Sequence, residues 1–255
     1  MFFKTKKNKP GYWGKYNSWQ EALADANGYD SNTIIEKVKN SALEVKNGHA
    51  KFERDSVIFD KIEYSWPTLS CILQSIIENN NILNIIDFGG SLGSTYFAFK
   101  NFIPKNTKIN WAIVEQPKIV SIGNNFFKSD ELFFFETLKS AKMTFSPSII
   151  LLSSSLPYIE KPYELLDEIF AYSFNKIIID RTPILKKEND RITLQIVPPN
   201  IYDASYPAWF FNEKNLLNKF KNTSYRLIAD FEGIAKKIKL EDCIAYEKGY
   251  LFQKK

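Results

Sequence analysis

Cysteine and histidine are almost absent from this chain. The 255 residues contain two cysteines, Cys71 and Cys243, and one histidine, His49. Two isolated thiols cannot build a disulfide framework, and with a single imidazole they cannot form a closed zinc site. We therefore expect a metal-free protein without disulfides, which is typical of the reducing cytoplasm.

Long apolar runs are also missing. No segment reaches the ~20 apolar residues that a membrane-spanning helix needs. Phe2 and Phe3 precede lysines rather than the apolar stretch of a secretory signal, so we expect no such signal. The net charge of +5 comes mainly from dispersed lysines, densest between Lys4 and Lys9, where a solvated tail is the simpler interpretation. No nucleic-acid-binding motif is present, so we expect no nucleic-acid partner.

Apolar and aromatic residues are abundant instead. Hydrophobic residues make up 44% of the chain, which includes 21 phenylalanines and 13 tyrosines. This composition supports a sizeable core and excludes disorder of the whole chain. The length favours one α/β domain with an appendage.

Short apolar runs alternate with helix-like segments after residue 80. The runs show little polar alternation, as expected for parallel strands that are covered on both faces. The predicted strands are Ile82–Phe88, Ile109–Glu115, Leu132–Phe135, Ile149–Ser153 and Lys176–Asp180, and the predicted crossover helices are Thr95–Phe102, Lys118–Phe127 and Tyr163–Tyr172. This alternation predicts an α/β, Rossmann-like fold with a doubly wound, mostly parallel sheet over residues 81–255.

The segment before this core is predicted to be an N-terminal helical cap over residues 1–80. Helices are expected over Trp19–Ala26 and Ile34–Val45, with Ser18 and Ser31 as their caps, and again over Leu69–Ile77.

The segment after Asp180 breaks the pattern. Its prolines exclude a long helix over about 182–212, which we predict to be an insertion that covers the site. A helix over Glu213–Phe220 is expected next. The last strands, Tyr225–Phe231 and Tyr246–Gln253, have no obvious helix between them, so we expect an antiparallel pair at the sheet edge.

A glycine-rich turn, Asp-Phe-Gly-Gly-Ser-Leu-Gly at residues 87–93, follows the first predicted strand and enters a helix. Such a turn lets the backbone approach a ligand closely, with helix N-terminal amides facing it. A Walker loop needs lysine after its last glycine, and none follows Gly93. A dinucleotide fingerprint would need glycine at Ser91 and Ser94, so that motif fails twice.

The spacing of Asp87, Gly89 and Gly93 resembles motif I of class I S-adenosylmethionine-dependent methyltransferases, although Ser91 stands where that family usually has a further glycine. Glu115 ends the next predicted strand, about 20 residues after the loop, where an acid commonly binds ribose hydroxyls. Either feature alone fits an ordinary turn or an exposed glutamate. The resemblance implies S-adenosylmethionine as cofactor, bound by Asp87, Gly89, Gly90, Ser91, Gly93, Glu115, Gln116, Ser153 and Ser154.

The wider pattern is similar to a narrower family of class I methyltransferases that is associated with bacterial surface-polysaccharide genes. The segments that carry this resemblance are Gly-Tyr-Trp-Gly at 11–14, Ser-Trp at 18–19, Gly-Tyr-Asp at 28–30, Glu-Arg-Asp-Ser at 53–56, the glycine turn at 87–93, Val-Glu-Gln at 114–116, Ser-Ser-Ser-Leu-Pro-Tyr at 153–158, Arg-Thr-Pro at 181–183 and Ser-Tyr-Pro-Ala-Trp at 205–209. The resemblance implies O-methylation of a sugar, or of a phosphorylated or nucleotide-linked precursor, in capsule or lipopolysaccharide biosynthesis.

The acceptor side is predicted from the later strand ends and the insertion. Arg181 could hold an anionic acceptor through paired hydrogen bonds or could only pair with Asp180. The predicted acceptor-binding residues are Tyr158, Arg181, Arg191, Gln195 and Tyr206, and the catalytic candidates are Asp180, Tyr206 and His49. The simpler interpretation gives His49 no role. Residues 53–55, Glu-Arg-Asp, either form a turn held by salt bridges or supply an acidic side chain that faces the acceptor.

Two alternative functions stay open at this point. A methyltransferase-like subunit could bind the cofactor and support a partner enzyme without turnover. A nicotinamide-dependent oxidoreductase is disfavoured by the incomplete dinucleotide fingerprint. The oligomeric state also stays open, with a homodimer as one arrangement.

Overall fold

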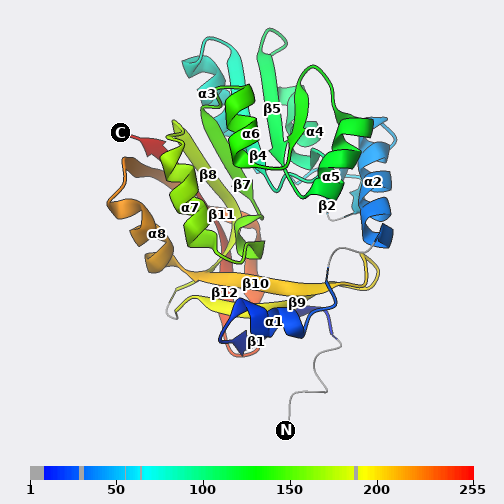
Figure 1. Cartoon of the computed structure of the whole chain (residues 1–255), viewed down its shortest axis with the longest axis vertical. Coiled ribbons are helices and arrows are strands. Elements are labelled where there is room, and N and C mark those ends of the chain that lie inside the picture. The colour runs from blue at the N-terminus through cyan, green and yellow to red at the C-terminus, as the bar shows by residue number, and fades with distance from the viewer. Residues whose placement is uncertain (1–8, 29–31, 55, 64, 187–188) are drawn as a thin grey trace.

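A computed structural model describes residues 9–28, 32–54, 56–63, 65–186 and 189–255 (Figure 1). Most of the lysine-rich segment 4–9, the predicted cap Ser31, and Tyr29, Asp30 and Asp55 lie outside these residues.

Five parallel strands form the centre of the protein, in the order β6-β5-β4-β7-β8. They are β4 (Ile82–Phe88), β5 (Lys108–Val114), β6 (Leu132–Phe135), β7 (Ile149–Ser153) and β8 (Lys176–Leu185). The first four match predicted runs to within one residue, whereas β8 continues five residues beyond its predicted end at Asp180. The first of these strands along the chain is β4, and β5 and β6 follow on one side of it. The chain then crosses to the other side of β4 and forms β7, so a topological switch point lies between β4 and β7.

The two C-terminal strands extend this sheet beyond β8. Strand β12 (Ile244–Lys254) pairs antiparallel with β8, and β11 (Tyr225–Lys239) pairs antiparallel with β12. The predicted antiparallel pairing is confirmed. The antiparallel strand β12 itself lies inside the sheet, however, and β11 forms the edge.

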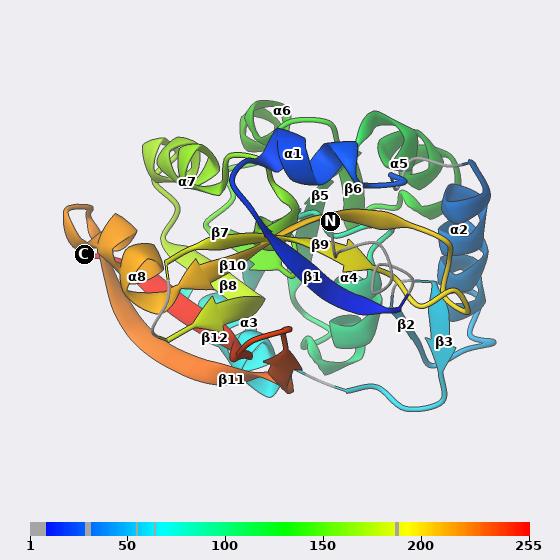
Figure 2. The same ribbon diagram turned by 90° about the horizontal axis from the view of Figure 1, so that it is seen from below.

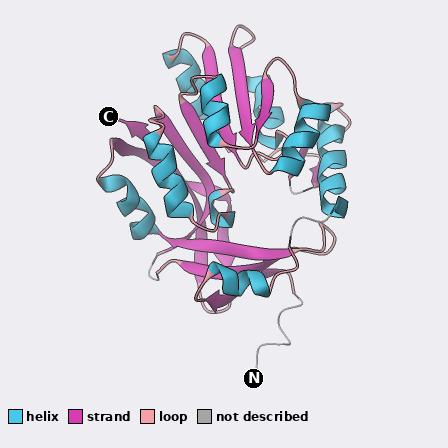
Figure 3. Cartoon of the chain, viewed as in Figure 1, coloured by secondary structure: helices cyan, strands magenta, loops and turns pink. Residues whose placement is uncertain are grey.

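Helices cover both faces of the central sheet (Figures 1 and 3). One apolar cluster joins one face to α2 (Asn32–Lys46), α3 (Trp66–Glu78), α4 (Ser94–Phe99) and α5 (Pro117–Ile122), and Ile85 of the sheet belongs to it. A second cluster joins α6 (Leu138–Thr144), α7 (Pro162–Ala171) and α8 (Glu213–Lys221) to the other face, and Ile86 belongs to that cluster. Adjacent residues of one strand thus serve opposite layers, so the predicted doubly wound, Rossmann-like fold is confirmed.

The helical segments are α2 (Asn32–Lys46), α3 (Trp66–Glu78), α4 (Ser94–Phe99), η1 (Lys100–Phe102), α5 (Pro117–Ile122), η2 (Gly123–Phe127), α6 (Leu138–Thr144), η3 (Leu156–Tyr158), α7 (Pro162–Ala171) and α8 (Glu213–Lys221). A further short helix, α1 (Trp19–Ala24), begins at Ser18, whose side chain accepts a hydrogen bond from the Glu21 amide as predicted. Within the described part of the chain, no helix is long and apolar enough to cross a membrane.

A second set of strands corrects one prediction, because β1 (Gly11–Tyr16) is a strand within the expected helical cap. The expected insertion has no long helix and contains β9 (Arg191–Ile196) and β10 (Ser205–Asn212). The three form an antiparallel β1-β9-β10 layer, and the end of β10 pairs with Ile184 and Leu185 of β8. This layer crosses below the carboxyl ends of the parallel strands, with α1 beside it (Figures 1 and 2). The N-terminal segment also supplies a small hairpin of β2 (Phe52–Arg54) and β3 (Val57–Phe59).

Candidate functional site

A cavity of about 710 Å³ lies at the carboxyl ends of the parallel strands. The turns after β4, β5 and β7 and the middle of β8 form its sheet side, and residues of α1, the β2 hairpin, β9 and β10 contribute to the other walls. This is the switch-point position at which open α/β sheets bind ligands. The predicted insertion and the N-terminal segment therefore both cover the site, though largely as strands.

The glycine turn after β4 folds back over its own strand end. Gly89 has a φ of +72°, and a Cβ atom there would lie 2.6 Å from Cβ of Ser155. A Cβ atom on Gly90 would lie 2.6 Å from Cγ of Asp87. Real side chains do not tolerate such distances, so both positions need glycine, and the bare backbone forms part of the cavity wall.

Asp87 lies directly beneath this turn and is 1% exposed. Its Oδ2 accepts a hydrogen bond from Nε1 of Trp111 at 3.2 Å, whereas Oδ1 has no hydrogen-bond partner among the described residues. Burial raises the pKa of Asp87 to about 7, against the opposing effects of the Trp111 bond and the Arg181 charge. An unsatisfied acceptor of this kind beside a cavity fits a ligand that brings a cationic donor.

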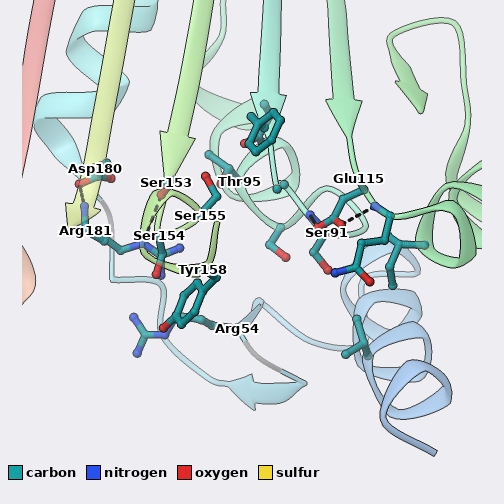
Figure 4. A pocket seen from close by; sticks show the side chains of 18 of the residues that line it. Arg54, Ser91, Thr95, Glu115, Ser153, Ser154, Ser155, Tyr158, Asp180 and Arg181 are labelled. Carbon is teal, nitrogen blue, oxygen red and sulfur yellow. Dashed lines mark hydrogen bonds between the residues drawn. The ribbon is translucent and has the colours of Figure 1, made fainter. Parts of the chain in front are cut away.

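Glu115 follows β5 and curls toward the same turn (Figure 4). Its Oε1 accepts from the Ser91 amide at 3.2 Å and its Oε2 accepts from the Gln116 amide at 2.8 Å. Burial raises the pKa of Glu115, and these two bonds lower it. A carboxylate has about four lone-pair sites, so each oxygen can accept one more hydrogen bond, such as those from a vicinal diol. Gln116, at the start of α5, also lines the cavity.

The turn after β7 is linked to residues 180–181 in the middle of β8. Ser154 has a φ of 59° and its amide donates to the Asp180 carbonyl at 2.9 Å. Arg181 has a φ of 49°, and its Nε donates to Oγ of Ser153 at 3.2 Å. Asp180 accepts from the Arg181 amide at 2.8 Å and from Oγ1 of Thr68 at 3.0 Å, so each carboxylate oxygen has a donor. This arrangement suits Asp180 to positioning Arg181, and its catalytic role stays a prediction.

Three predicted acceptor residues come together on the wall formed by η3, β9 and β10. The Tyr158 hydroxyl donates to Oε1 of Gln195 at 2.8 Å. The rings of Tyr158 and Tyr206 meet edge to face with centroids 5.3 Å apart. All three residues line the cavity, which is the position predicted for them.

Two predicted residues lie elsewhere. The His49 side chain is 63% exposed, with Nδ1 3.4 Å from a Glu44 carboxylate oxygen, and it does not line the cavity. Arg191 is buried and forms an ion pair with Asp242 at 2.7 Å, also outside the lining. A general-base role for His49 and an acceptor role for Arg191 therefore have no geometric support.

The β2 hairpin brings Glu53 and Arg54 to the cavity. Glu53 is 3% exposed and accepts a hydrogen bond from Oγ of Ser94. Of the two interpretations of this acidic segment, the cavity-facing one thus fits Glu53. Trp19 and Ser155, from two of the segments that carry the family resemblance, also line the cavity. Sequence reasoning missed Ser94, because its partner Glu53 is 41 residues away along the chain.

Acidic residues do not gather into a metal-ligand set here. Across the described ranges, no group of three or more histidine, cysteine, aspartate or glutamate side chains is placed to hold a metal ion.

Comparisons with known proteins give likeness in structure but not in sequence. No protein-family model matches the chain, and no curated protein sequence matches it. Among solved structures, the N-terminal domain of EvdMO1, determined in the presence of SAH and D-fucose, is 12% identical with a TM-score of 0.49, covering 90% of this chain and 100% of that one. Magnesium protoporphyrin IX methyltransferase from Synechocystis with bound SAM is 8% identical, with a TM-score of 0.47, 86% of this chain covered and 97% of that one. An S-adenosylmethionine-dependent methyltransferase from Clostridium acetobutylicum is 13% identical, with a TM-score of 0.46, 75% of this chain covered and 92% of that one.

Proposed function

We propose that this protein is an S-adenosylmethionine-dependent methyltransferase that acts on a small molecule. The observation that carries the proposal is the pairing of Asp87, with its unsatisfied buried oxygen under a glycine-only turn, and Glu115 at the end of the next strand. S-adenosylmethionine has a cationic ammonium group at its amino acid end and a ribose diol, which match these two carboxylates. When bound, this cofactor would supply an electrophilic methyl group.

The chain's own contribution is alignment. Methyl transfer from a sulfonium is an in-line displacement, for which orientation can supply about 7–11 kcal/mol. The glycine turn and Glu115 would hold the cofactor on one side of the cavity. Tyr158, Gln195 and Tyr206 would orient the acceptor on the other, because their mutual contacts fix their side chains.

The acceptor in this proposal is a sugar, or a phosphorylated or nucleotide-linked sugar precursor, used in the cytoplasm for bacterial surface-polysaccharide biosynthesis. Support comes from the sequence resemblance and from the aromatic side chains of Trp19, Tyr158 and Tyr206 in the cavity wall, which suit the apolar face of a sugar ring.

Ligand-induced stabilisation tests the cofactor. S-adenosylhomocysteine at 100 times its Kd should stabilise the native state by about 2.7 kcal/mol. Glu115→Ala should weaken binding by about 1–3 kcal/mol, because charge-assisted hydrogen bonds are lost. The control is Glu168→Ala on the exposed side of α7, away from the cavity. Stabilisation by NAD but not by S-adenosylhomocysteine would contradict the proposal.

Turnover distinguishes an enzyme from a silent subunit. With S-adenosylmethionine and a panel of sugars and sugar phosphates, mass spectrometry should detect a product heavier by one methylene group. Tight S-adenosylhomocysteine binding without any methylated product across the panel would favour the supporting-subunit alternative.

A further inference from the structure

The described residues that line the cavity include two arginines, Arg54 and Arg181, and six acids, Glu53, Glu63, Asp87, Glu115, Glu136 and Asp180. Asp87 lies at the carboxyl end of β4, and Glu115 and Glu136 directly follow β5 and β6, on the side assigned to the cofactor. Arg54 and Arg181 are the only basic side chains among the described lining residues. Figure 4 shows both on the side where Tyr158 lies, away from Glu115. Both guanidinium groups of the cavity therefore lie on the acceptor side. The acids beside them already have partners there, since Glu63 pairs with Arg54 and Asp180 accepts hydrogen bonds from the Arg181 amide and Thr68.

The Arg181 guanidinium is positioned by one hydrogen bond and keeps further N–H donors available. Its Nε bonds Ser153, and its terminal nitrogens have no partner among the residues that the structure describes. Its left-handed backbone, with a φ of 49°, coincides with a break in the β8–β12 register opposite Gly249. Such a bulge re-aims a side chain, and strained backbone is concentrated at functional sites. Here the bulge places Arg181 in the cavity wall.

Arg54 approaches from the β2 hairpin. Its guanidinium lies over the Phe59 ring, 5.3 Å from the centroid, and its Nη1 is 3.6 Å from Oε2 of Glu63. The Glu63 side chain is 62% exposed, so this ion pair is weak and easily exchanged. Burial raises the pKa of Glu247, and the charges of Arg181 and Arg54 both lower it. The two guanidinium groups therefore act on one small region.

We propose that Arg54 and Arg181 form a phosphate-binding subsite and that the acceptor carries a phosphate ester that docks there. The inference rests on the proposed function and replaces Arg191 with Arg54 as the second arginine. A carboxylate offers two oxygens, which a single guanidinium fork satisfies, whereas a phosphate ester offers three oxygens and close to two charges. Two guanidinium groups from separate elements match the phosphate ester better.

Titration calorimetry at pH 8 and fixed ionic strength tests the subsite directly. Inorganic phosphate and glucose 1-phosphate should bind the wild-type protein, and glucose and glucuronate should bind much more weakly. Arg54→Gln and Arg181→Gln should each weaken phosphate binding about tenfold or more, as expected when a charged hydrogen bond is lost. Lysine at either position should restore binding only partly, because it lacks the planar fork. Two variants on different elements keep the test valid if one of them fails to fold.

Arg226→Gln is the matched control, because Arg226 is exposed on β11 and lies outside the cavity. It should bind phosphate like the wild-type protein. Equal phosphate affinity in the control and in either cavity variant would overturn the subsite, as would glucuronate binding as tightly as glucose 1-phosphate. Thermal stabilisation by S-adenosylhomocysteine is measured in parallel and tests the proposed function alone. If it fails while arginine-dependent phosphate binding persists, the methyltransferase proposal is wrong and the anion subsite stands.

Discussion

Replacement of Asp87 by asparagine should make the stability of the ligand-free protein less dependent on pH. Asp87 is buried with one unsatisfied oxygen, and burial raises its pKa from 3.8 to about 7. In the unfolded chain the carboxyl ionises near pH 4, so its ionisation opposes folding between about pH 4 and about pH 7. The wild-type protein therefore loses up to about 4 kcal/mol of stability over this range.

Asparagine does not titrate and can still accept the Trp111 hydrogen bond through its carbonyl oxygen. Its amide group is left without a clear partner, at a cost of about 1–3 kcal/mol that is independent of pH. The informative quantity is thus the difference in free energy of unfolding between Asp87→Asn and wild type. It should shift in favour of the variant by up to about 4 kcal/mol from pH 4 to pH 8.

Urea-induced unfolding, followed by tryptophan fluorescence at several pH values, measures this difference. Asp203→Asn, at an exposed position, reports the effect of the chemical change alone. Asp87→Asn should also lose S-adenosylhomocysteine binding. Asp87 would then be a residue that lowers the stability of the free protein but is needed for ligand affinity. Parallel stability–pH curves for Asp87→Asn and wild type would refute the reasoning.

Three further predictions concern the glycine turn, Glu115 and Arg191. Gly90→Ala should abolish stabilisation by S-adenosylhomocysteine, measured by thermal unfolding, because the new methyl group would lie 2.6 Å from Cγ of Asp87; unchanged stabilisation would show that the turn does not bind the ligand. Glu115→Gln should raise the Kd for S-adenosylhomocysteine about tenfold in calorimetry, because an amide can keep only one of the two backbone hydrogen bonds. Arg191→Met should destabilise the fold by about 1–3 kcal/mol in urea through loss of its Asp242 ion pair, while the Kd for inorganic phosphate stays near wild type; a large rise in that Kd would restore Arg191 to the acceptor site.

The parallel core could be predicted because its signal is local. In β4 the run Ile82–Phe88 is mostly apolar on both faces, as expected for a strand that is covered by two helical layers. The same holds for β7, where the run Ile149–Ser153 matches the strand at both ends. The acids Asp87 and Glu115 were found for the same reason, since each lies at the carboxyl end of such a run.

The β1-β9-β10 layer could not be predicted from local pattern. β1 is mostly half-buried, and its pairing with β9 joins Tyr12 to Gln195 across most of the chain. Nothing in the segment around Tyr12 indicates that partner. The prediction that Arg191 binds the acceptor failed for a related reason. Arg191 forms an ion pair with Asp242, and the sequence around Arg191 does not indicate such a distant partner.

The pairing of β1 with β9 has a consequence for synthesis of the chain. A ribosome adds about 5–20 residues per second, so β9, the pairing partner of β1, is synthesised roughly 10–40 s after β1. The acceptor wall of the cavity therefore closes only after the parallel strands have been made. A nascent chain that has folded through β8 would carry the glycine turn with Asp87 and Glu115 but not the layer that crosses below them. All residues of the half of the cavity assigned to the cofactor are thus synthesised before the last residues of the half that selects the acceptor.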